Sequence, residues 1–159
     1  MNVYTRGMIS GFFATVALSL LMMIKSKMGM IPEFDIISML GAMAGHVVGV
    51  TDWNVGWLLH FLIGTLVWGP SFARLHDRLP GTSSIMRGVV FGVLAWLLMM
   101  GLLMPMAGAG FFGRSLGVVA PSLALVLHLE FGTVLGLAYG RLGTLRHLSA
   151  GGVGVSGVD

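Results

Sequence analysis

The apolar positions of the chain gather into four long stretches, which are separated by short segments that contain proline, glycine and charge. The stretches cover about residues 7–24, 55–75, 85–105 and 121–142. About 20 mostly apolar residues are enough for a helix to cross a bilayer. The runs are too long for strands, and they lack the alternation of a membrane barrel. Because lipid offers the backbone no hydrogen bonds, the pattern predicts four transmembrane helices.

A shorter apolar segment follows the first stretch. Pro32, Glu33 and Asp35 are typical of a helix start, with proline in the first turn and acids near the positive end of the helix dipole. We predict a helix over about 33–46, too short to cross the membrane, at the periplasmic interface or in the mouth of the bundle. An irregular surface loop is the alternative. Residues 147–159 are predicted to be a flexible tail, which leaves 1–146 as one transmembrane domain.

The composition agrees with a membrane protein. Apolar side chains make up 56% of the chain and charged ones 9%, against about 25% charged in a typical soluble domain. This excludes an ordinary soluble enzyme and a disordered regulator. The net charge is +3 and the basic residues are scattered, so we expect no nucleic-acid partner. The chain has no cysteine, which excludes disulfides and thiolate metal sites.

The basic residues predict the orientation in the membrane. Lys25, Lys27 and Arg114 fall on one side of the four spans, and six arginines fall on the other. The positive-inside rule therefore predicts that both termini are cytoplasmic. The first span lacks a small-residue cleavage pattern, which favours an uncleaved helix over a signal peptide. The six arginines are Arg6, Arg74, Arg78, Arg87, Arg141 and Arg146.

The sequence also predicts an internal repeat. An Arg-Gly start followed by a second glycine and an alanine recurs in the first and third spans, and a Leu-His pair followed by Gly-Thr recurs in the second and fourth. Arg-Leu pairs then close the second and fourth spans, with a slip of one residue. We predict two similar helical hairpins, related by an axis along the membrane normal and packed as a four-helix bundle. Chance similarity between Gly- and Leu-rich spans is the alternative.

Glycines four residues apart predict close helix packing. In lipid, small residues let helices approach closely, and positions four apart share one face of a helix. The histidines of the second and fourth spans fall on the same faces, and a leucine at Gly64 or Gly132 should wedge the helices apart. Because these faces exceed what four helices need internally, they favour self-association or a membrane-protein partner. The predicted packing positions are Gly7, Gly11, Gly64, Gly88, Gly92, Gly132 and Gly136.

Glu130 lies near the middle of the fourth span, where a charged acid is costly, so it is a candidate functional residue. It is either protonated or paired, and the sequence offers His60, Lys25 or Arg114 as partners. Lining a transport pathway and hydrogen bonding to a neighbouring helix or subunit are the two interpretations. The repeat-equivalent position is Leu62, so the shared scaffold does not require the acid.

His60 and His128 are the other polar candidates inside the membrane. On facing helices they could be the axial ligands of a b-type haem, although haem needs a wide apolar slot. Hydrogen bonds across a tight helix interface are the interpretation we favour, and no cofactor is predicted.

Methionine is the third candidate group, since ten of the 13 methionines fall towards the outer half and His46 is nearby in sequence. Thioethers suit Cu(I). However, methionine is also an adaptable filler of apolar gaps, and there is no regular Met-x-x-Met series. No metal site is predicted. The ten are Met22, Met23, Met28, Met30, Met39, Met43, Met99, Met100, Met104 and Met106.

Several segments together resemble a family of small bacterial inner-membrane proteins of unknown function with four predicted spans. The segments are the Arg-Gly start of the first span, the loop at 30–35, the Leu-His span at 59–65 and the Pro-Met-Ala-Gly turn at 105–110. The resemblance covers about residues 5–142 and implies an inner-membrane location.

We therefore expect an all-α integral membrane four-helix bundle. Because no hydrolase elbow, phosphate loop or zinc-protease helix occurs in the sequence, we expect a non-enzymatic, self-associating or accessory subunit of a membrane complex. A transporter or channel for protons or small solutes, with Glu130, His60 and His128 on the pathway, is the alternative.

Overall fold

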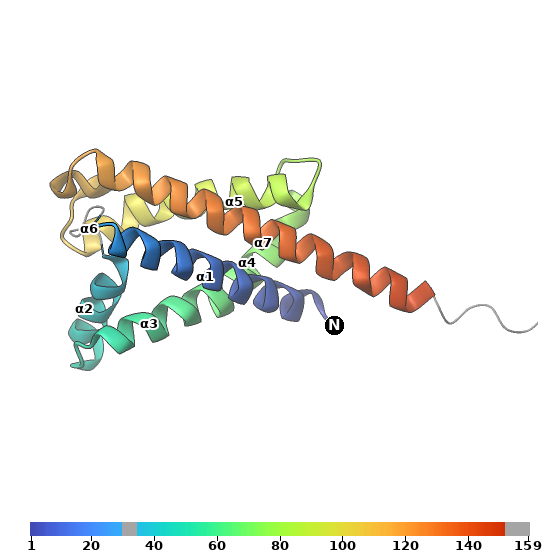
Figure 1. Cartoon of the computed structure of the whole chain (residues 1–159), viewed down its shortest axis with the longest axis horizontal. Helices are drawn as coiled ribbons and strands as arrows, with labels where there is room; N and C mark the ends of the chain where they lie inside the picture. Colours follow the sequence, from blue (N-terminus) through green and yellow to red (C-terminus); the bar gives the residue numbers. More distant parts are fainter. Residues whose placement is uncertain (30–34, 152–159) are drawn as a thin grey trace, which may run out of the picture.

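The computed structural model describes residues 1–29 and 35–151, and this part of the chain contains helices and no strand (Figure 1). Four helical segments are long and apolar enough to cross a membrane, so the four predicted spans and the all-α class are confirmed. Each segment is a few residues longer than predicted, because the helices continue past the apolar core into polar caps. The segments are Val3–Lys27, Trp53–Arg78, Ser84–Met106 and Val119–Thr144.

The first and fourth spans are continuous α-helices, whereas the second and third are composite. The first span is α1 (Val3–Lys27), and the fourth belongs to α7 (Val119–Gly151). The second consists of α3 (Trp53–Leu62), the π-helix η1 (Ile63–Trp68), α4 (Gly69–Leu75) and the 3-10 turn η2 (His76–Arg78). The third consists of α5 (Ser84–Leu98), the π-helix η3 (Met99–Leu103) and α6 (Met104–Met106), and the 3-10 turn η4 (Phe111–Leu116) precedes α7.

Proline explains the position of both π-helices. Pro70 follows η1 and Pro105 follows η3, each at the start of the next α-helical turn. A proline lacks the N–H for the bond to the carbonyl four residues earlier, and its ring crowds that carbonyl. The affected carbonyls, those of Leu66 and Gly101, lie inside η1 and η3. The backbone adapts by widening to the π register, in which the N–H of Gly69 donates to the carbonyl of Gly64.

The π-helix η1 coincides with the one-residue slip found in the sequence. Between Thr65 and Arg74 the second span has one residue more than the fourth has between Thr133 and Arg141. A π-helix accommodates one additional residue within an α-helix, and α7 has none at the matching place. The internal duplication itself stays a prediction.

The short helix α2 (Ile36–Val48) lies at one end of the bundle, between the end of α1 and the start of α3 (Figure 1). Its start differs from the prediction: the carboxylate of Asp35 caps it by accepting from the backbone N–H groups of Ile37 and Ser38 at 3.0 and 3.3 Å. Residues 30–34, which include Glu33, lie outside the described residues. We call this end of the bundle the α2 end.

The helix α7 continues to Gly151, past residue 147, where the flexible tail was predicted to start, and the flexibility of the tail stays a prediction. Figure 1 shows α7 extending beyond the other helices, at the end of the bundle where the N-terminus also lies. Residues 152–159 of the predicted tail lie outside the described residues.

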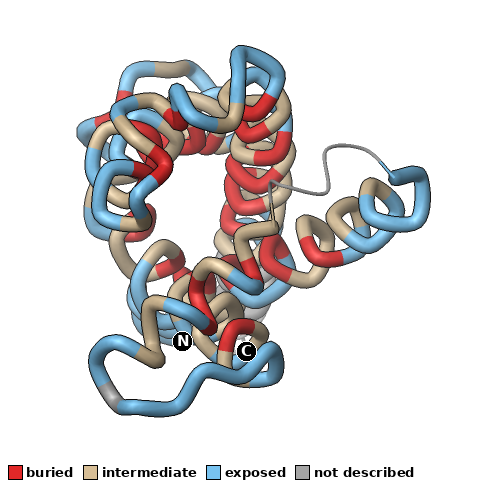
Figure 2. The backbone as a smooth tube through the Cα atoms, turned by 90° about the vertical axis from the view of Figure 1, so that its left-hand side faces the viewer, coloured by how far each residue is buried: buried red, intermediate tan, exposed pale blue. Residues whose placement is uncertain are grey.

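Glycines set the closest approaches between helices. A Cβ atom at Gly7 would lie 2.5 Å from the carbonyl oxygen of Gly69, and one at Gly11 would lie 2.5 Å from that of Gly64. These contacts join α1 to the second span. In the same way Gly88 meets Gly132 and Gly136, and Gly92 meets the carbonyl of His128, which joins α5 to α7. Figure 2 shows that the buried residues lie where the long helices face one another.

All seven predicted packing glycines therefore contact another helix of the same chain. They no longer support the expectation of a partner protein. That expectation assumed more small-residue faces than four helices use. Gly7 and Gly11 of α1 contact the second span, Gly64 of the second span contacts α1, and the remaining four lie between α5 and α7.

We expect Gly132→Ala to lower the free energy of unfolding by about 1–3 kcal/mol, the range of overpacking substitutions. Its Cβ would overlap the backbone carbonyl of Gly88, which cannot swing aside as a side chain can. The matched control is Gly101→Ala, whose Cβ would have only Phe111 nearby, at 3.8 Å. Thermal unfolding in detergent, followed by circular dichroism, would contradict this packing if both variants melted at the wild-type temperature.

Candidate functional site

A cavity of about 110 Å³ lies between the spans, and all four of them line it. Most of its lining is apolar, and His60 of α3, His128 of α7 and Thr15 of α1 bring polar groups to it. Ile36 and Leu40 of α2 also contribute, so the cavity reaches towards the α2 end of the bundle. Its size is comparable to the roughly 150 Å³ of an apolar cavity that binds benzene. The space suits a small molecule or an ion with its ligands.

Both π-helices border this cavity. Ile63, Gly64 and Trp68 of η1 and Met99 and Leu103 of η3 are among its lining residues. π-Helical segments inside α-helices occur frequently at functional sites, because they shift side chains out of the α-helical register. Their place here marks the cavity as the candidate site. The sequence signal that could have located both π-helices is the proline within each of these spans, because the carbonyl four residues before a proline loses its α-helical hydrogen bond.

The imidazole of His60 packs against two aromatic rings, with the centroids of Trp57 and Phe61 both 5.8 Å from its own and 6.3 Å from each other. Its Nε2 atom is buried and has no hydrogen-bond partner. A buried nitrogen without a partner is energetically costly, and Trp57 Nε1 beside it is in the same condition. The hydrogen bond across a helix interface that the sequence favoured for His60 is therefore not present at this atom.

The imidazole of His128 is oriented by its own helix. Its Nδ1 atom lies 2.7 Å from the carbonyl oxygen of Ala124, one turn earlier. Because a carbonyl only accepts, Nδ1 carries the hydrogen, and Nε2 is left with a free lone pair. The structure thus brings His60 and His128, predicted from the repeat, to one cavity.

Glu130 is the predicted site residue that the structure places elsewhere. It does not line the cavity. Two residues along an α-helix correspond to a turn of about 200°, so Glu130 and His128 point to different sides of α7. Its Oε2 atom is buried and accepts no hydrogen bond, so none of the three partners considered from the sequence donates to that oxygen. The half-buried carboxyl group lies on a side of α7 away from the cavity.

A second polar cluster, which the sequence analysis missed, holds together the end of the bundle opposite α2. The guanidinium of Arg6 lies 3.6 Å above the ring of Tyr139, and its Nε donates to the Tyr139 carbonyl at 2.6 Å. The Tyr139 ring also contacts His76, at 4.8 Å between centroids. Asp77 Oδ1 lies 2.8 Å from His76 Nδ1 and accepts from Arg87 at 3.2 Å.

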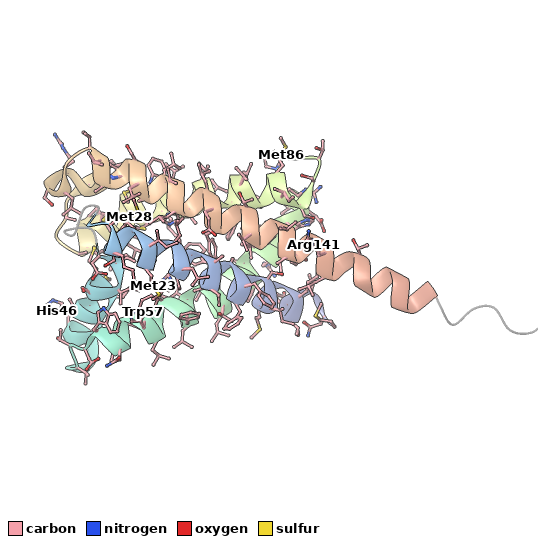
Figure 3. The ribbon with its side chains drawn as sticks, in the orientation of Figure 1. Met23, Met28, His46, Trp57, Met86 and Arg141 are labelled. Atoms are coloured by element: carbon pink, nitrogen blue, oxygen red, sulfur yellow. The ribbon has the colours of Figure 1, made fainter. Side chains whose placement is uncertain are left out.

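This second cluster connects α1, α7, η2 and α5, and it lies in the part of the bundle where Figure 3 labels Met86 and Arg141. In the same view Met28 and His46 lie at the α2 end. The run His76-Asp77-Arg78, directly after an apolar span, was the signal for it in the sequence.

The cavity does not fit the haem that the two histidines suggested. A porphyrin ring has several times the volume of a benzene-sized molecule, and this cavity is on the scale of the latter. Among residues 1–29 and 35–151, no three His, Cys, Asp or Glu side chains are grouped as they would be around a metal ion.

Four helices long and apolar enough to cross a membrane indicate a multi-pass helical membrane protein. A family model described as "Family of unknown function (DUF6789)" matches residues 1–149, so the chain belongs to that family. The resemblance noted in the sequence is thereby confirmed. No curated protein and no solved structure matches the chain.

We expect Arg6→Gln to lower the free energy of unfolding by about 1–3 kcal/mol, because it removes a charge-assisted hydrogen bond and a cation–π contact. Arg74→Gln, at an exposed position of α4, is the matched control, with an expected change within about 0.5 kcal/mol. Thermal unfolding in detergent measures both, and equal melting temperatures would contradict a stabilising role for the Arg6 cluster.

Proposed function

We propose that the protein is a non-enzymatic membrane protein that binds a small solute or ion between its four spans and conducts it through the membrane. The observation that carries this proposal is the cavity, which all four spans line and to which His60 and His128 contribute. If the cavity were only a gap in the packing of apolar helices, we would expect apolar side chains alone to line it. Here His60, His128 and Thr15 bring polar side chains to an otherwise apolar lining, where a polar solute or an ion could bind.

The arrangement of the helices supports conduction in a second way. Many transporters place their binding site near the membrane midplane, between structural repeats and beside interrupted helices. The two π-helices interrupt the second and third spans at the cavity. The predicted repeat pairs His60 with His128, so a duplication would place one imidazole from each copy at the site.

The same proposal orients the protein in the bacterial inner membrane with both termini in the cytoplasm. It rests on the six arginines that precede or follow the spans at the end opposite α2. With that orientation, the cavity would lie nearer to the periplasmic face, beneath α2.

We expect a cysteine at a cavity position to react with a membrane-impermeant cationic thiol reagent, and one that faces lipid not to react. The natural chain contains no cysteine, so single-cysteine variants report without background. Leu103→Cys lies in the cavity lining, and Leu102→Cys, at a 50% exposed neighbouring position, is its control. Thr15→Cys and Phe13→Cys form a second pair. The reagent needs a thiolate, which forms only where water reaches the sulfur.

The reaction is followed by mass spectrometry on protein in sealed liposomes. Faster modification of Leu103→Cys and Thr15→Cys than of their controls would support a water-accessible pathway. If the cavity positions were as unreactive as the lipid-facing ones, the cavity would be sealed and the proposed conduction would be wrong.

An accessory or self-associating subunit is the second candidate, and Glu130 favours it. A carboxyl group that is half-buried within a span and away from the cavity would gain from a polar group on a neighbouring membrane helix. A second chain on this side of α7 would supply that group. This candidate is compatible with conduction through the cavity.

We expect Glu130→Leu to dissociate such a complex, whereas Val126→Leu, at an exposed position one turn earlier, leaves it intact. Glu130→Gln keeps the hydrogen-bonding capacity without the charge, so it should retain more of the complex than Glu130→Leu. Light scattering in mild detergent and crosslinking in native membranes measure association. A wild-type protein that is monomeric and crosslinks to nothing would exclude this candidate.

A further inference from the structure

Each of the four spans contributes one imidazole or thioether side chain to the cavity lining. They are Met22 of α1, His60 of α3, Met99 of η3 and His128 of α7. We propose that these four side chains form an intramembrane binding site for a monovalent soft metal ion, Cu(I). The inference rests on the proposed function, because it names the ion that the cavity would bind and conduct.

The donor atoms indicate which metal ion the site would bind. Thioether sulfur is a soft ligand that selects Cu(I), and imidazole nitrogen also suits copper. None of the residues that line the cavity is an aspartate or glutamate, so the site lacks the carboxylate ligands typical of Mg²⁺ and Ca²⁺ sites. Two thioethers and two imidazoles are all neutral ligands, and they leave a bound Cu(I) with a single positive charge. A single charge is far less costly to hold in a low-dielectric interior than a double one.

The hydrogen bonding of both imidazoles leaves a ring nitrogen that could bind a metal ion. His128 uses Nδ1 to bond the Ala124 carbonyl, the arrangement by which a metal-binding histidine is usually oriented, and its Nε2 lone pair is free. His60 Nε2 is buried without a partner.

Further methionines connect the cavity to the α2 end. Met100 and Met104 are fully buried and form one cluster with Met99, and Met22 and Met39 pack against it. Because these side chains come from α1, α2 and the end of the third span, the cluster offers successive thioethers between the α2 end and the site. Methionine as a simple filler would account for packing. Packing alone does not explain why two thioether side chains line the same cavity as two histidines.

The test uses the full chain, purified in detergent without metal and kept under anaerobic, reducing conditions. Cu(I) is titrated in competition with the coloured chelator bicinchoninate, and X-ray absorption at the copper edge identifies the bound atoms. We expect one Cu(I) per chain, with both sulfur and nitrogen neighbours. The double variant Met22→Leu/Met99→Leu should bind at least about tenfold more weakly and lose the sulfur signal. Leucine replaces methionine at similar volume, so the fold should be kept.

The matched control is Met23→Leu/Met106→Leu, two methionines at positions 50% and 65% exposed, which should bind Cu(I) as the wild type does. His60→Phe, which keeps a ring beside Trp57, tests the nitrogen ligand, and we expect weaker binding with a reduced nitrogen signal. Circular dichroism and gel filtration confirm folding of each variant.

Two results would overturn the copper site: no Cu(I) bound by the wild type, or undiminished affinity in both the Met22/Met99 and His60 variants. These results are separate from a failure of the proposed function. Cysteine labelling at Leu103 and Thr15 without Cu(I) binding would mean that the pathway serves another solute. Cu(I) binding in a cavity that the thiol reagent does not reach would support the copper site and contradict conduction.

Discussion

Direct contact between backbones at glycine is the interaction on which the structure depends. Lipid tails are as apolar as leucine, so helices in a membrane gain nothing by hiding apolar side chains from each other. Association relies on close van der Waals contact, which Gly7 and Gly11 permit against the second span and Gly88 and Gly92 permit between α5 and α7. Two tight helix pairs result. Arg6 then ties α1 of the first pair to α7 of the second.

The cavity follows from the same small residues and from two prolines. Gly64, Ala95 and Ala124 line it from three different spans, and none of them has a side chain long enough to fill the space. Pro70 and Pro105 impose the π-helices that turn Ile63, Trp68, Met99 and Leu103 towards it. The glycine contacts of α1 with the second span and of α5 with α7 lie towards the end opposite α2, whereas Ile36 and Leu40 of α2 help to line the cavity. We call these two parts of the bundle the locked half and the hollow half.

Two clusters of side chains correspond to these halves. At the end opposite α2, Phe72, Phe91 and Tyr139 pack edge to face beneath the Arg6 and Arg87 hydrogen bonds. At the α2 end, Met99, Met100 and Met104 occupy the equivalent place. Rigid aromatic rings and directional hydrogen bonds hold one geometry, whereas flexible thioether side chains adapt to changes in shape. The locked half anchors the helices around which the cavity would bind its ligand.

The sequence by itself determined the four spans, the short helix and the packing glycines, because each depends on local composition and on the 3.6-residue period of a helix. It also singled out His60 and His128 through their matching neighbours. Only the tertiary structure decided what those residues do. It placed both histidines with Met22 and Met99 in one cavity, turned Glu130 to another side of α7, and used every predicted glycine internally. The reason is that a helical period says which residues share a face, but only the packing of distant helices decides which faces meet.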